Sequence, residues 1–382
     1  MSNELDKRDD SLENNKLYSR IADLIEHARQ KVASVVNLTM VHTYFEVGRL
    51  IVEEEQQGKQ RAEYGKKVLK NLSARLTDKF GKGFSVENLD KMRFFYNTYS
   101  NSISSTASTK LNSTNNSIEA NQKKPIVDMQ NDFDLTVIAK SHNFTLSWSH
   151  YLILMRIQNT AERNFYEIEA TNENWSERQL SRQYHSSLYE RLALSRNKED
   201  VMKLANEGHT VVRPEDILKN PLSLEFLGME EKDSYTESDL EHAIISKLQQ
   251  FLLELGKGFL FEARQKRFTF DYEHYFVDLV FYNRLLQCYV IIDLKTDKLT
   301  HQDLGQIQMY VNYYDRFEKR EFEKPTIGIL LCKKKTTALV ELTLPEDARI
   351  YASEYTLYLP DKKLLQLKLT EWILEFDDLN KD

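Results

Sequence analysis

Two apolar segments in the C-terminal part of the sequence each carry a carboxylate that a buried strand does not need. Asp278 lies within the run 275–282, and Asp293 lies near the end of the run 287–295. An aspartate inside an apolar strand is costly unless something pairs with it. Because side chains alternate along a strand, Asp293 and Lys295 point to the same face. Two acids and a lysine therefore form a candidate site.

The two segments are close enough in sequence to form a hairpin through residues 283–286. In the register that we assume, Tyr282 faces Gln287. Asp278 is then diagonal to Asp293, roughly 7–8 Å away at Cα, so that both acids could hold one cation. A slip of one residue would turn one of them to the other face of the sheet.

Two carboxylates with room for water suit Mg²⁺, or Mn²⁺ in its place, because a hard cation binds a few acids and keeps several waters. Such an ion lowers the pKa of a bound water and stabilises charge on a phosphate, and Lys295 could orient that water or offset negative charge. The alternative is that Asp278 and Asp293 are strand-end residues capped by lysine and backbone donors. For either aspartate alone that alternative is favoured, whereas the set of three favours a metal site.

These residues resemble the active-site signature of the PD-(D/E)xK nuclease superfamily: an aspartate, a hairpin, and then Asp293-x-Lys295. The wider sequence resembles the YhcG-type family of bacterial proteins with such a nuclease domain. The resemblance is carried by residues 241–245, 259–265, 276–282, 291–295 and 305–310. It implies a restriction-endonuclease-like α-β-β-β-α-β core and metal-dependent cleavage of phosphodiester bonds.

The same resemblance implies roles for single residues. Asp278 and Asp293 resemble the metal ligands, and Lys295 resembles the catalytic lysine. Val277 stands where the name of the superfamily has proline, a departure that does not affect the chemistry. Asp293 is the shorter of the two acids that this position accepts, so the metal must lie slightly closer to the backbone.

Three further residues resemble supporting groups of the family. Glu241 resembles an acid that some members supply from the first helix, and it falls at the edge of an apolar stripe. An exposed helix acid is the alternative for Glu241. Gln306 and Tyr310 resemble a Gln-x-x-x-Tyr element, and their spacing of four places them on one face of a helix. Glu262 is a rival acid that no pattern supports.

The charge balance is unusual for a protein that binds nucleic acid. The sequence has 52 Lys+Arg against 59 Asp+Glu, a net charge of −7. Affinity for DNA comes largely from neutralising phosphates, so we expect a localised basic groove. The candidates for it are Arg264, Lys266, Arg267 and Lys298 near the site, and Lys82, Arg178 and Arg182 in the helical part. A solvated helix face is the alternative for the last two.

The sequence also predicts the compartment. Its two cysteines, Cys288 and Cys332, lie in apolar runs without the spacing of a disulfide framework or a zinc site. The polar first residues are unlike a secretory signal, and no apolar run reaches transmembrane length. We expect a reducing, cytoplasmic protein that does not enter membranes.

Local patterns predict several element boundaries. Helix caps are expected at Ser85, Thr236 and Thr300, and a capping box at Ser176 and Gln179. The first strand of the nuclease domain is expected at 259–270, and strand-like segments around 355–359 and 364–369.

Composition and periodicity predict a multidomain α+β protein with a helical N-terminal half. A glycine turn at 81–83 joins two helices in a pattern typical of helix-turn-helix or winged-helix units, although helix pairs also occur in proteins that never touch DNA. The predicted parts are a disordered tail (1–15), a helical domain for DNA or partner binding (16–100), a flexible Ser/Thr/Asn-rich linker (101–126), a helical middle region continuing that domain (127–230) and the nuclease domain (231–382).

Two functions remain in view. The first is a Mg²⁺-dependent endonuclease that acts on DNA, with a homodimer or another protein as partner. The second is a non-catalytic DNA-binding or assembly protein with a degenerate nuclease fold. A sugar or nucleotide enzyme is a third class, but the sequence has no glycine-rich phosphate loop. Whether the substrate is duplex, branched, modified or RNA stays open at this point.

Overall fold

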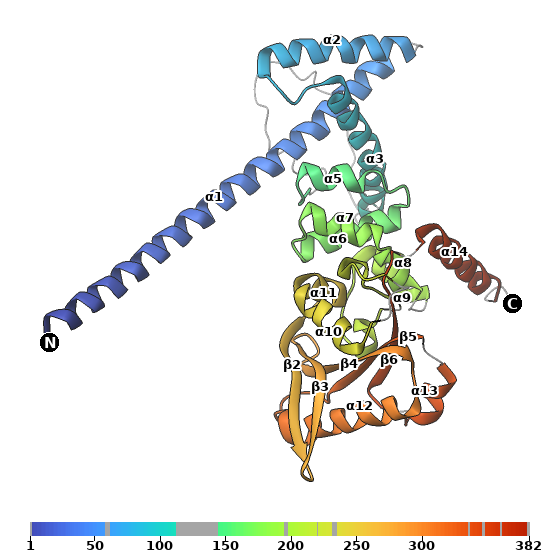
Figure 1. The fold of residues 1–382 in the computed structure, drawn as a ribbon. Helices are drawn as coiled ribbons and strands as arrows, with labels where there is room; N and C mark the ends of the chain where they lie inside the picture. The colour runs from blue at the N-terminus through green and yellow to red at the C-terminus, as the bar shows by residue number, and fades with distance from the viewer. Residues whose placement is uncertain are drawn as a thin grey trace. The chain divides into compact units, whose positions relative to one another are not determined.

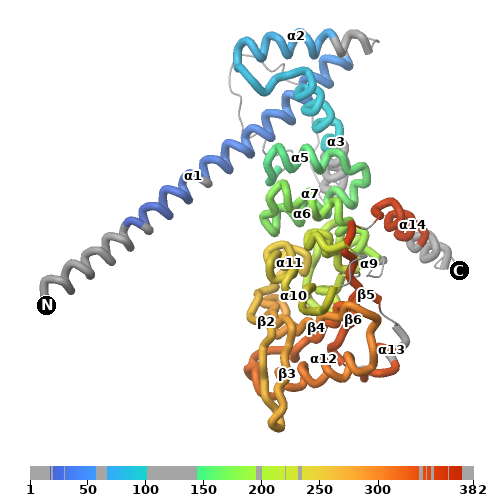
Figure 2. Tube along the Cα trace, viewed as in Figure 1, coloured from blue at the N-terminus to red at the C-terminus, as the bar shows by residue number. Residues whose placement is uncertain are grey.

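The structure is a computed structural model of the chain (Figures 1 and 2). It describes residues 2–57, 62–111, 144–194, 198–219, 221–230, 235–334, 337–345, 348–359 and 361–379. The chain divides into two compact units, Met1–Gln158 and Asn159–Asp382. Each unit is described by itself below.

The described part of the first unit is helical. Its helices are α1 (Ser2–Gln57), α2 (Ala62–Phe80), α3 (Val86–Leu111) and α5 (Trp148–Leu154). The helix α1 includes residues 2–15, for which we expected disorder; no proline and no glycine before Gly48 interrupts it. The helix α3 extends through 101–111 of the expected linker, and residues 112–143 lie outside the described part of the chain.

Aromatic side chains hold the first unit together. Phe95 of α3 is fully buried and lies within 5.0–5.6 Å, centroid to centroid, of the rings of Phe45, Phe144 and Tyr151. Ser85 caps α3 as predicted, because its hydroxyl accepts a hydrogen bond of 3.2 Å from the amide of Asn88. The described residues of this unit contain helices and no strand, so they show no β wing.

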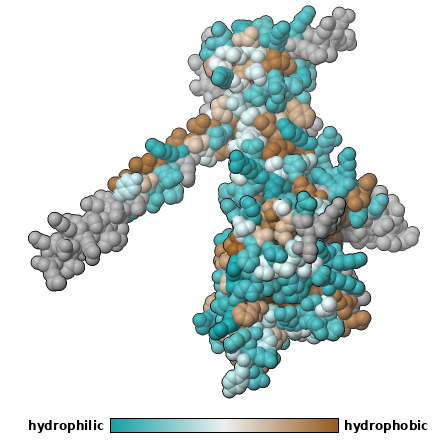
Figure 3. All heavy atoms as spheres, in the orientation of Figure 1, coloured by the Kyte–Doolittle hydropathy of each residue, from teal (hydrophilic) through white to brown (hydrophobic). Residues whose placement is uncertain are grey.

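The helix α1 carries apolar side chains on its surface, seen as brown patches in Figure 3. The exposed large apolar and aromatic side chains that the structure describes on α1 are Tyr18, Ile21, Leu24, Ile25, Val32, Val35, Val36 and Leu50. They are interspersed with charged and polar residues. Among the described helices, none combines the length and the apolar character needed to cross a membrane.

The second unit begins with a layer of short helices. These are α6 (Thr160–Asn172), α7 (Glu177–His185), α8 (Leu188–Ala193) and α9 (Lys198–Glu207), followed by a 3-10 turn at Pro214–Ile217 and another at Glu225–Leu227. The predicted capping box of α7 is confirmed, since the side chains of Ser176 and Gln179 each bind the other's backbone amide.

A six-stranded sheet in the order β1-β6-β5-β4-β3-β2 forms the centre of this unit (Figure 1). Its strands are β1 (Leu222–Ser223), β2 (Phe259–Phe270), β3 (Glu273–Asn283), β4 (Cys288–Lys298), β5 (Ile327–Lys334) and β6 (Ile350–Thr356). The strands β2, β3 and β4 are antiparallel, whereas β4, β5, β6 and β1 are parallel.

Helices cover both faces of the sheet. Their bounds are α10 (Glu237–Ser246), α11 (Leu248–Leu255), α12 (His301–Tyr313, continued by a π-helical turn at Tyr314–Glu318) and α13 (Thr337–Thr343). Leu240 and Phe251 of α10 and α11 pack with Ile292 in one core, and Ile307 of α12 packs with Leu330 in another. The element order from α10 to β5 confirms the mixed α+β class and the predicted α-β-β-β-α-β core.

The C-terminal end differs from our expectation of a strand at residues 364–369. That segment belongs to the helix α14 (Lys362–Leu379). The carboxylate of Asp361 accepts hydrogen bonds of 3.0 and 3.2 Å from the amides of Lys363 and Leu364. This N-cap starts a helix where the apolar residues alone fitted either structure.

Candidate active site

The register of β3 against β4 corrects our assumption. Tyr282 pairs with Tyr289, and Gln287 belongs to the turn with a left-handed φ of 55°. The turn is longer because the side chain of Asn283 accepts hydrogen bonds from two amides within it. A shift of two residues keeps every side chain on its face. The last ladder pair is Leu279–Ile292, which brings Asp278 level with Asp293.

Asp278 lies where β3 separates from β4. Its Oδ2 accepts a hydrogen bond of 2.9 Å from the backbone amide of Leu294, and its Oδ1 accepts one of 3.0 Å from the side-chain amide of Gln265 on β2. The carboxylate therefore takes the place of a strand partner at the end of the ladder. Asp278 is half-buried, with one side toward solvent.

Asp293 and Lys295 form a close pair on β4. Asp293 is 1% exposed, and its Oδ2 is 2.9 Å from Nζ of Lys295, although without hydrogen-bond geometry. Burial and then the charge of Asp278 raise the pKa of Asp293 to about 7, while Lys295 acts in the opposite direction. Asp293 is therefore a buried carboxylate with another acid beside it, and Lys295 does not supply enough positive charge to keep its pKa at the ordinary value.

The amine of Lys295 lies near acids on three elements, β4, α10 and α12. Besides Asp293, its Nζ is 3.4 Å from Glu237 in the first turn of α10 and 3.9 Å from Asp303 in the first turn of α12. Burial acts against its charge, but Asp293, Glu237 and Asp278 outweigh that effect and raise its pKa above the ordinary value. The amine is therefore protonated at neutral pH. Both helices begin at the predicted threonine caps, Thr236 and Thr300.

Glu241 reaches the site from α10, and Gln265 links it to Asp278. Glu241 is 3% exposed; its Oε2 accepts a hydrogen bond from Nε2 of Gln265, and its Oε1 accepts none from any residue that the structure describes. Gln265 has a left-handed φ of 46°, a strained backbone for a residue with a side chain. Sequence reasoning missed Gln265 as a site residue because positive φ at a non-glycine residue leaves no pattern in the sequence.

Gln306 and Tyr310 lie on α12, next to the carboxylates. Nε2 of Gln306 donates a hydrogen bond of 2.5 Å to the hydroxyl of Tyr310. Burial is the main cause that raises the pKa of Tyr310, to which the charges of Asp293 and Asp278 add. The six predicted residues of the site thus come from α10, β3, β4 and α12. In the described part of the chain, no three His, Cys, Asp or Glu side chains are already grouped as metal ligands.

The predicted basic residues fall into different places. Arg264 is next to the site, with its Nε 3.7 Å from Oε1 of Glu241. Lys266 and Arg267 are exposed on the outer part of β2, and Lys298 is exposed at the end of β4. Lys82 is exposed in the turn between α2 and α3 of the first unit, and Arg178 is exposed on α7 of the second.

The structure contradicts the DNA-contact role that we expected for Arg182. Its side chain is only 15% exposed, and its guanidinium binds Glu225 at 3.0 Å and Glu254 at 3.3 Å. The alternative of a solvated face is also wrong for this residue. Glu254 is fully buried and is bound at 2.6 Å by Arg191, which is equally buried. Arg182 therefore belongs to an ion-pair network that joins α7 and α8 to α11.

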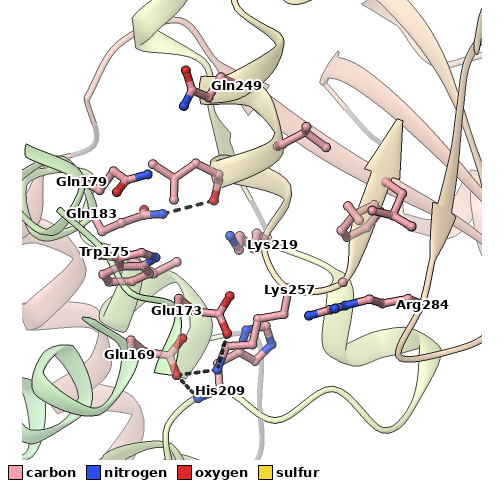
Figure 4. A pocket seen from close by; sticks show the side chains of 17 residues that line it. Glu169, Glu173, Trp175, Gln179, Gln183, His209, Lys219, Gln249, Lys257 and Arg284 are labelled. Atoms are coloured by element: carbon pink, nitrogen blue, oxygen red, sulfur yellow. Dashed lines mark hydrogen bonds and ion pairs between the residues drawn. The ribbon is translucent and has the colours of Figure 1, made fainter. Parts of the chain in front are cut away.

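A pocket of about 350 Å³ lies beside that network, away from the predicted residues (Figure 4). Figure 4 shows Lys257 bound to Glu169, at 2.8 Å, and Gln183 donating to the carbonyl of Leu253 at 3.1 Å. Lys219 also lines the pocket and donates to the carbonyl of Glu254. These groups pair with one another across the joint between the helical layer and α11, so we interpret the pocket as structural.

Two family models together match most of this chain. Residues 215–370 match the model of the YhcG PDDEXK nuclease domain, and residues 20–191 match the DUF1016 N-terminal domain. Two solved structures show weaker likeness. A repair endonuclease from Pyrococcus abyssi is 18% identical over 34% of this chain and 50% of its own (TM-score 0.23), and an EndoMS–double-stranded DNA complex is 19% identical over 35% and 49% (TM-score 0.25).

The strongest evidence is a full-length relative. The Escherichia coli (strain K12) protein named "Putative nuclease YhcG" is 38% identical over 364 residues, which is 94% of this chain and 95% of that protein. The likeness extends through both units, and the matching C-terminal domain contains Glu241, Asp278, Asp293 and Lys295. The chain therefore belongs to the YhcG family, with a DUF1016 N-terminal domain and a C-terminal nuclease domain of the PDDEXK type.

Proposed function

We propose that this nuclease domain hydrolyses phosphodiester bonds of DNA with the help of a divalent cation, Mg²⁺ or Mn²⁺. The observation that carries the proposal is a pair of carboxylates, Asp278 and Asp293, beside a protonated lysine, with more negative charge than the surrounding side chains balance. Such a surplus in a buried site is unstable unless a cation or a reacting group completes it.

The residues present fit a hard cation. Oε1 of Glu241 and Oδ2 of Asp293 are buried oxygens without hydrogen bonds to the described part of the chain, and carboxylate oxygens are the ligands that Mg²⁺ prefers. Asp278 and Asp293 would hold the ion, and Glu241 would support it directly or through Gln265. When bound, a divalent cation supplies a water of lowered pKa and offsets charge on the phosphate.

The other side chains have separate tasks. Lys295 is protonated, so it offsets negative charge that develops on the phosphate and does not accept a proton from water. Tyr310 keeps its proton at neutral pH because burial raises its pKa, and with Gln306 it can bind a phosphate oxygen or position the lysine. The helical N-terminal unit would position DNA or a partner protein. If it positions DNA, α2 and α3 would act as the helix-turn-helix unit.

Supercoiled plasmid incubated with Mg²⁺ tests the proposal. We expect nicking by the wild-type chain, none with EDTA, and a rate lowered by about 10³-fold or more in Asp293→Asn, because several kcal/mol of transition-state stabilisation is lost. Lys295→Met should lower the rate by about 10²–10³-fold, as other preorganised charge donors do. Gel densitometry gives both rates.

The matched control is Glu262→Gln. Glu262 is an exposed acid of β2, three residues from Gln265, and lies outside the group of acids described above. It should nick at the wild-type rate. Equal nicking by wild-type and Asp293→Asn proteins would refute the proposal. Binding of DNA without nicking in the presence of any divalent cation tested would instead support the second candidate, a DNA-binding or assembly protein with a degenerate nuclease fold.

A further inference from the structure

The outer half of the β2–β3 hairpin has one packed face. Phe268 stacks on Tyr275 of β3 and on Tyr313 of α12, with ring centroids 5.4 and 4.0 Å apart, and Val277 is fully buried beside them. Because side chains alternate, the residues between these positions point to the opposite face. They are Arg267, Thr269, His274 and Phe276, all of them exposed. We call this set the hairpin stripe.

The hairpin stripe continues the candidate active site. Arg267 pairs with Phe276 across the two strands, and Thr269 pairs with His274. The next position inward on the same face holds Gln265 and Asp278, whose side chains are hydrogen-bonded at 3.0 Å. The stripe therefore begins at a predicted metal ligand and runs outward along a hairpin whose end reaches beyond α12 (Figures 1 and 2).

The stripe has the chemistry of a stacking platform. Phe276 is two residues from Asp278, and its side chain is 47% exposed. A ring this exposed contributes little to the core of the domain. Arg267 lies directly across from Phe276, and its guanidinium has no hydrogen bond or ion pair within the described residues. An aromatic ring beside a free guanidinium can stack a base and bind its phosphate at once.

Base pairing decides which nucleic acid fits. In a duplex the faces of the bases are covered by their neighbours, so entry of a protein ring costs roughly a few kcal/mol of unstacking, whereas a base of an unpaired strand can stack without that cost. We propose that the hairpin stripe binds single-stranded DNA next to the bond that is cut, with a base stacked on Phe276 and its phosphate held by Arg267. This inference rests on the proposed function and narrows its substrate to DNA that has an unpaired stretch.

The test measures binding without cleavage. Full-length protein is titrated in EDTA against fluorescently labelled oligo(dT) and against a blunt duplex of equal length, with anisotropy as the readout. We expect the oligo(dT) to bind more tightly than the duplex. Phe276→Ala should weaken oligo(dT) binding by about tenfold, as loss of one stacking side chain does elsewhere, and affect duplex binding less. Arg267→Ala should weaken it and flatten its salt dependence.

Two residues of the opposite face provide the comparison. Phe270 and Lys266 alternate with the stripe along β2 and are also exposed. Phe270→Ala should leave oligo(dT) binding unchanged, and Lys266→Ala should weaken it less than Arg267→Ala. Equal losses from Lys266→Ala and Arg267→Ala, or an unchanged affinity in Phe276→Ala, would overturn the assignment.

The outcomes separate this inference from the proposed function. Tight oligo(dT) binding that depends on Phe276, in a protein that does not nick plasmid, supports the stripe and counts against the nuclease proposal alone. Nicking that depends on Asp293, together with duplex binding as tight as oligo(dT) binding, overturns the stripe alone. An oligo(U) that binds more tightly than oligo(dT) overturns the assignment to DNA and points to RNA.

Discussion

Glu254 and Asp293 are two buried carboxylates of the same unit with opposite electrostatic surroundings. Glu254 binds Arg191 at 2.6 Å, Arg182 at 3.3 Å and the amide of Ser223 at 3.0 Å. Burial tends to raise its pKa, but Arg191, Lys219 and Arg182 lower it to about 2. Asp293 has Lys295 on one side and another acid, Asp278, nearby, and its pKa is raised to about 7.

The difference shows which kind of buried charge indicates a reaction site. The acid of the ion-pair network, Glu254, is balanced by Arg191 and Arg182, and these ion pairs join α7 and α8 to α11. The acid of the sheet, Asp293, is not balanced by the side chains that the structure describes, which is costly in the folded protein alone and useful once a ligand completes the site. Burial by itself therefore does not distinguish a structural acid from a catalytic one.

The largest contrast should appear in stability. Glu254→Gln leaves Arg191 buried without its charge partner, so we expect the free energy of unfolding to fall by about 3 kcal/mol or more. Asp293→Asn removes an unbalanced charge, so we expect metal-free protein near neutral pH to gain about 1–3 kcal/mol. Urea unfolding of the full chain, followed by circular dichroism in EDTA, measures both. A loss of stability in both variants would show that Glu254 and Asp293 do not differ in charge balance as we infer.

The pH dependence of stability should have opposite signs at the two acids. Because the folded-state pKa of Asp293 is above its ordinary value of 3.8, its favourable contribution is complete below that value and is lost as pH rises to about 7. The pKa of Glu254 is below its ordinary value of 4.5, so its contribution is present above that value and is lost as pH falls to about 2.

Urea midpoints measured across this range in EDTA check the prediction. The advantage of Asp293→Asn over wild-type protein should grow from about pH 4 to about pH 7. The disadvantage of Glu254→Gln should shrink as pH falls below about 4.5. Curves that run parallel to wild type in either variant would show that the corresponding acid does not titrate as its surroundings imply.

The smallest effect is expected beside Asp293. Tyr310→Phe removes the hydroxyl that pairs with Gln306 and that we propose to contact the phosphate. Loss of one neutral hydrogen bond in the transition state, worth about 1 kcal/mol, should slow nicking by about fivefold. Initial nicking rates measure it. Tyr314→Phe is the matched control, because its buried hydroxyl has no hydrogen-bond partner among the described residues. A similar slowing in both variants would point to packing of the aromatic cluster as the cause.

Local patterns predicted the nuclease core well. Apolar runs and caps located β2 at Phe259–Phe270 and the starts of α10 and α12 at Thr236 and Thr300. These features depend on residues close together in the chain, where alternation and capping are set by neighbours. The resemblance to a family added the order of the strands, which no local pattern contains.

Contacts between distant segments were not predictable in the same way. The prediction that Arg182 lies on a solvated helix face was wrong because its partner, Glu254, is 72 residues away in the chain, on α11. The register of β3 on β4 was two residues off because the turn is fixed by a single side chain, Asn283. Gln265 was missed as a site residue because its left-handed φ of 46° leaves no pattern in the sequence.

By itself, the sequence determined that Asp278, Asp293 and Lys295 would lie on adjoining strands, since alternation and a short connection allow few other arrangements. Only the tertiary structure decided that Glu241 turns inward, that Arg182 turns to an acid, and that the stripe of Arg267 and Phe276 is left uncovered. These outcomes depend on how helices pack against the sheet, and packing is a property of the whole fold.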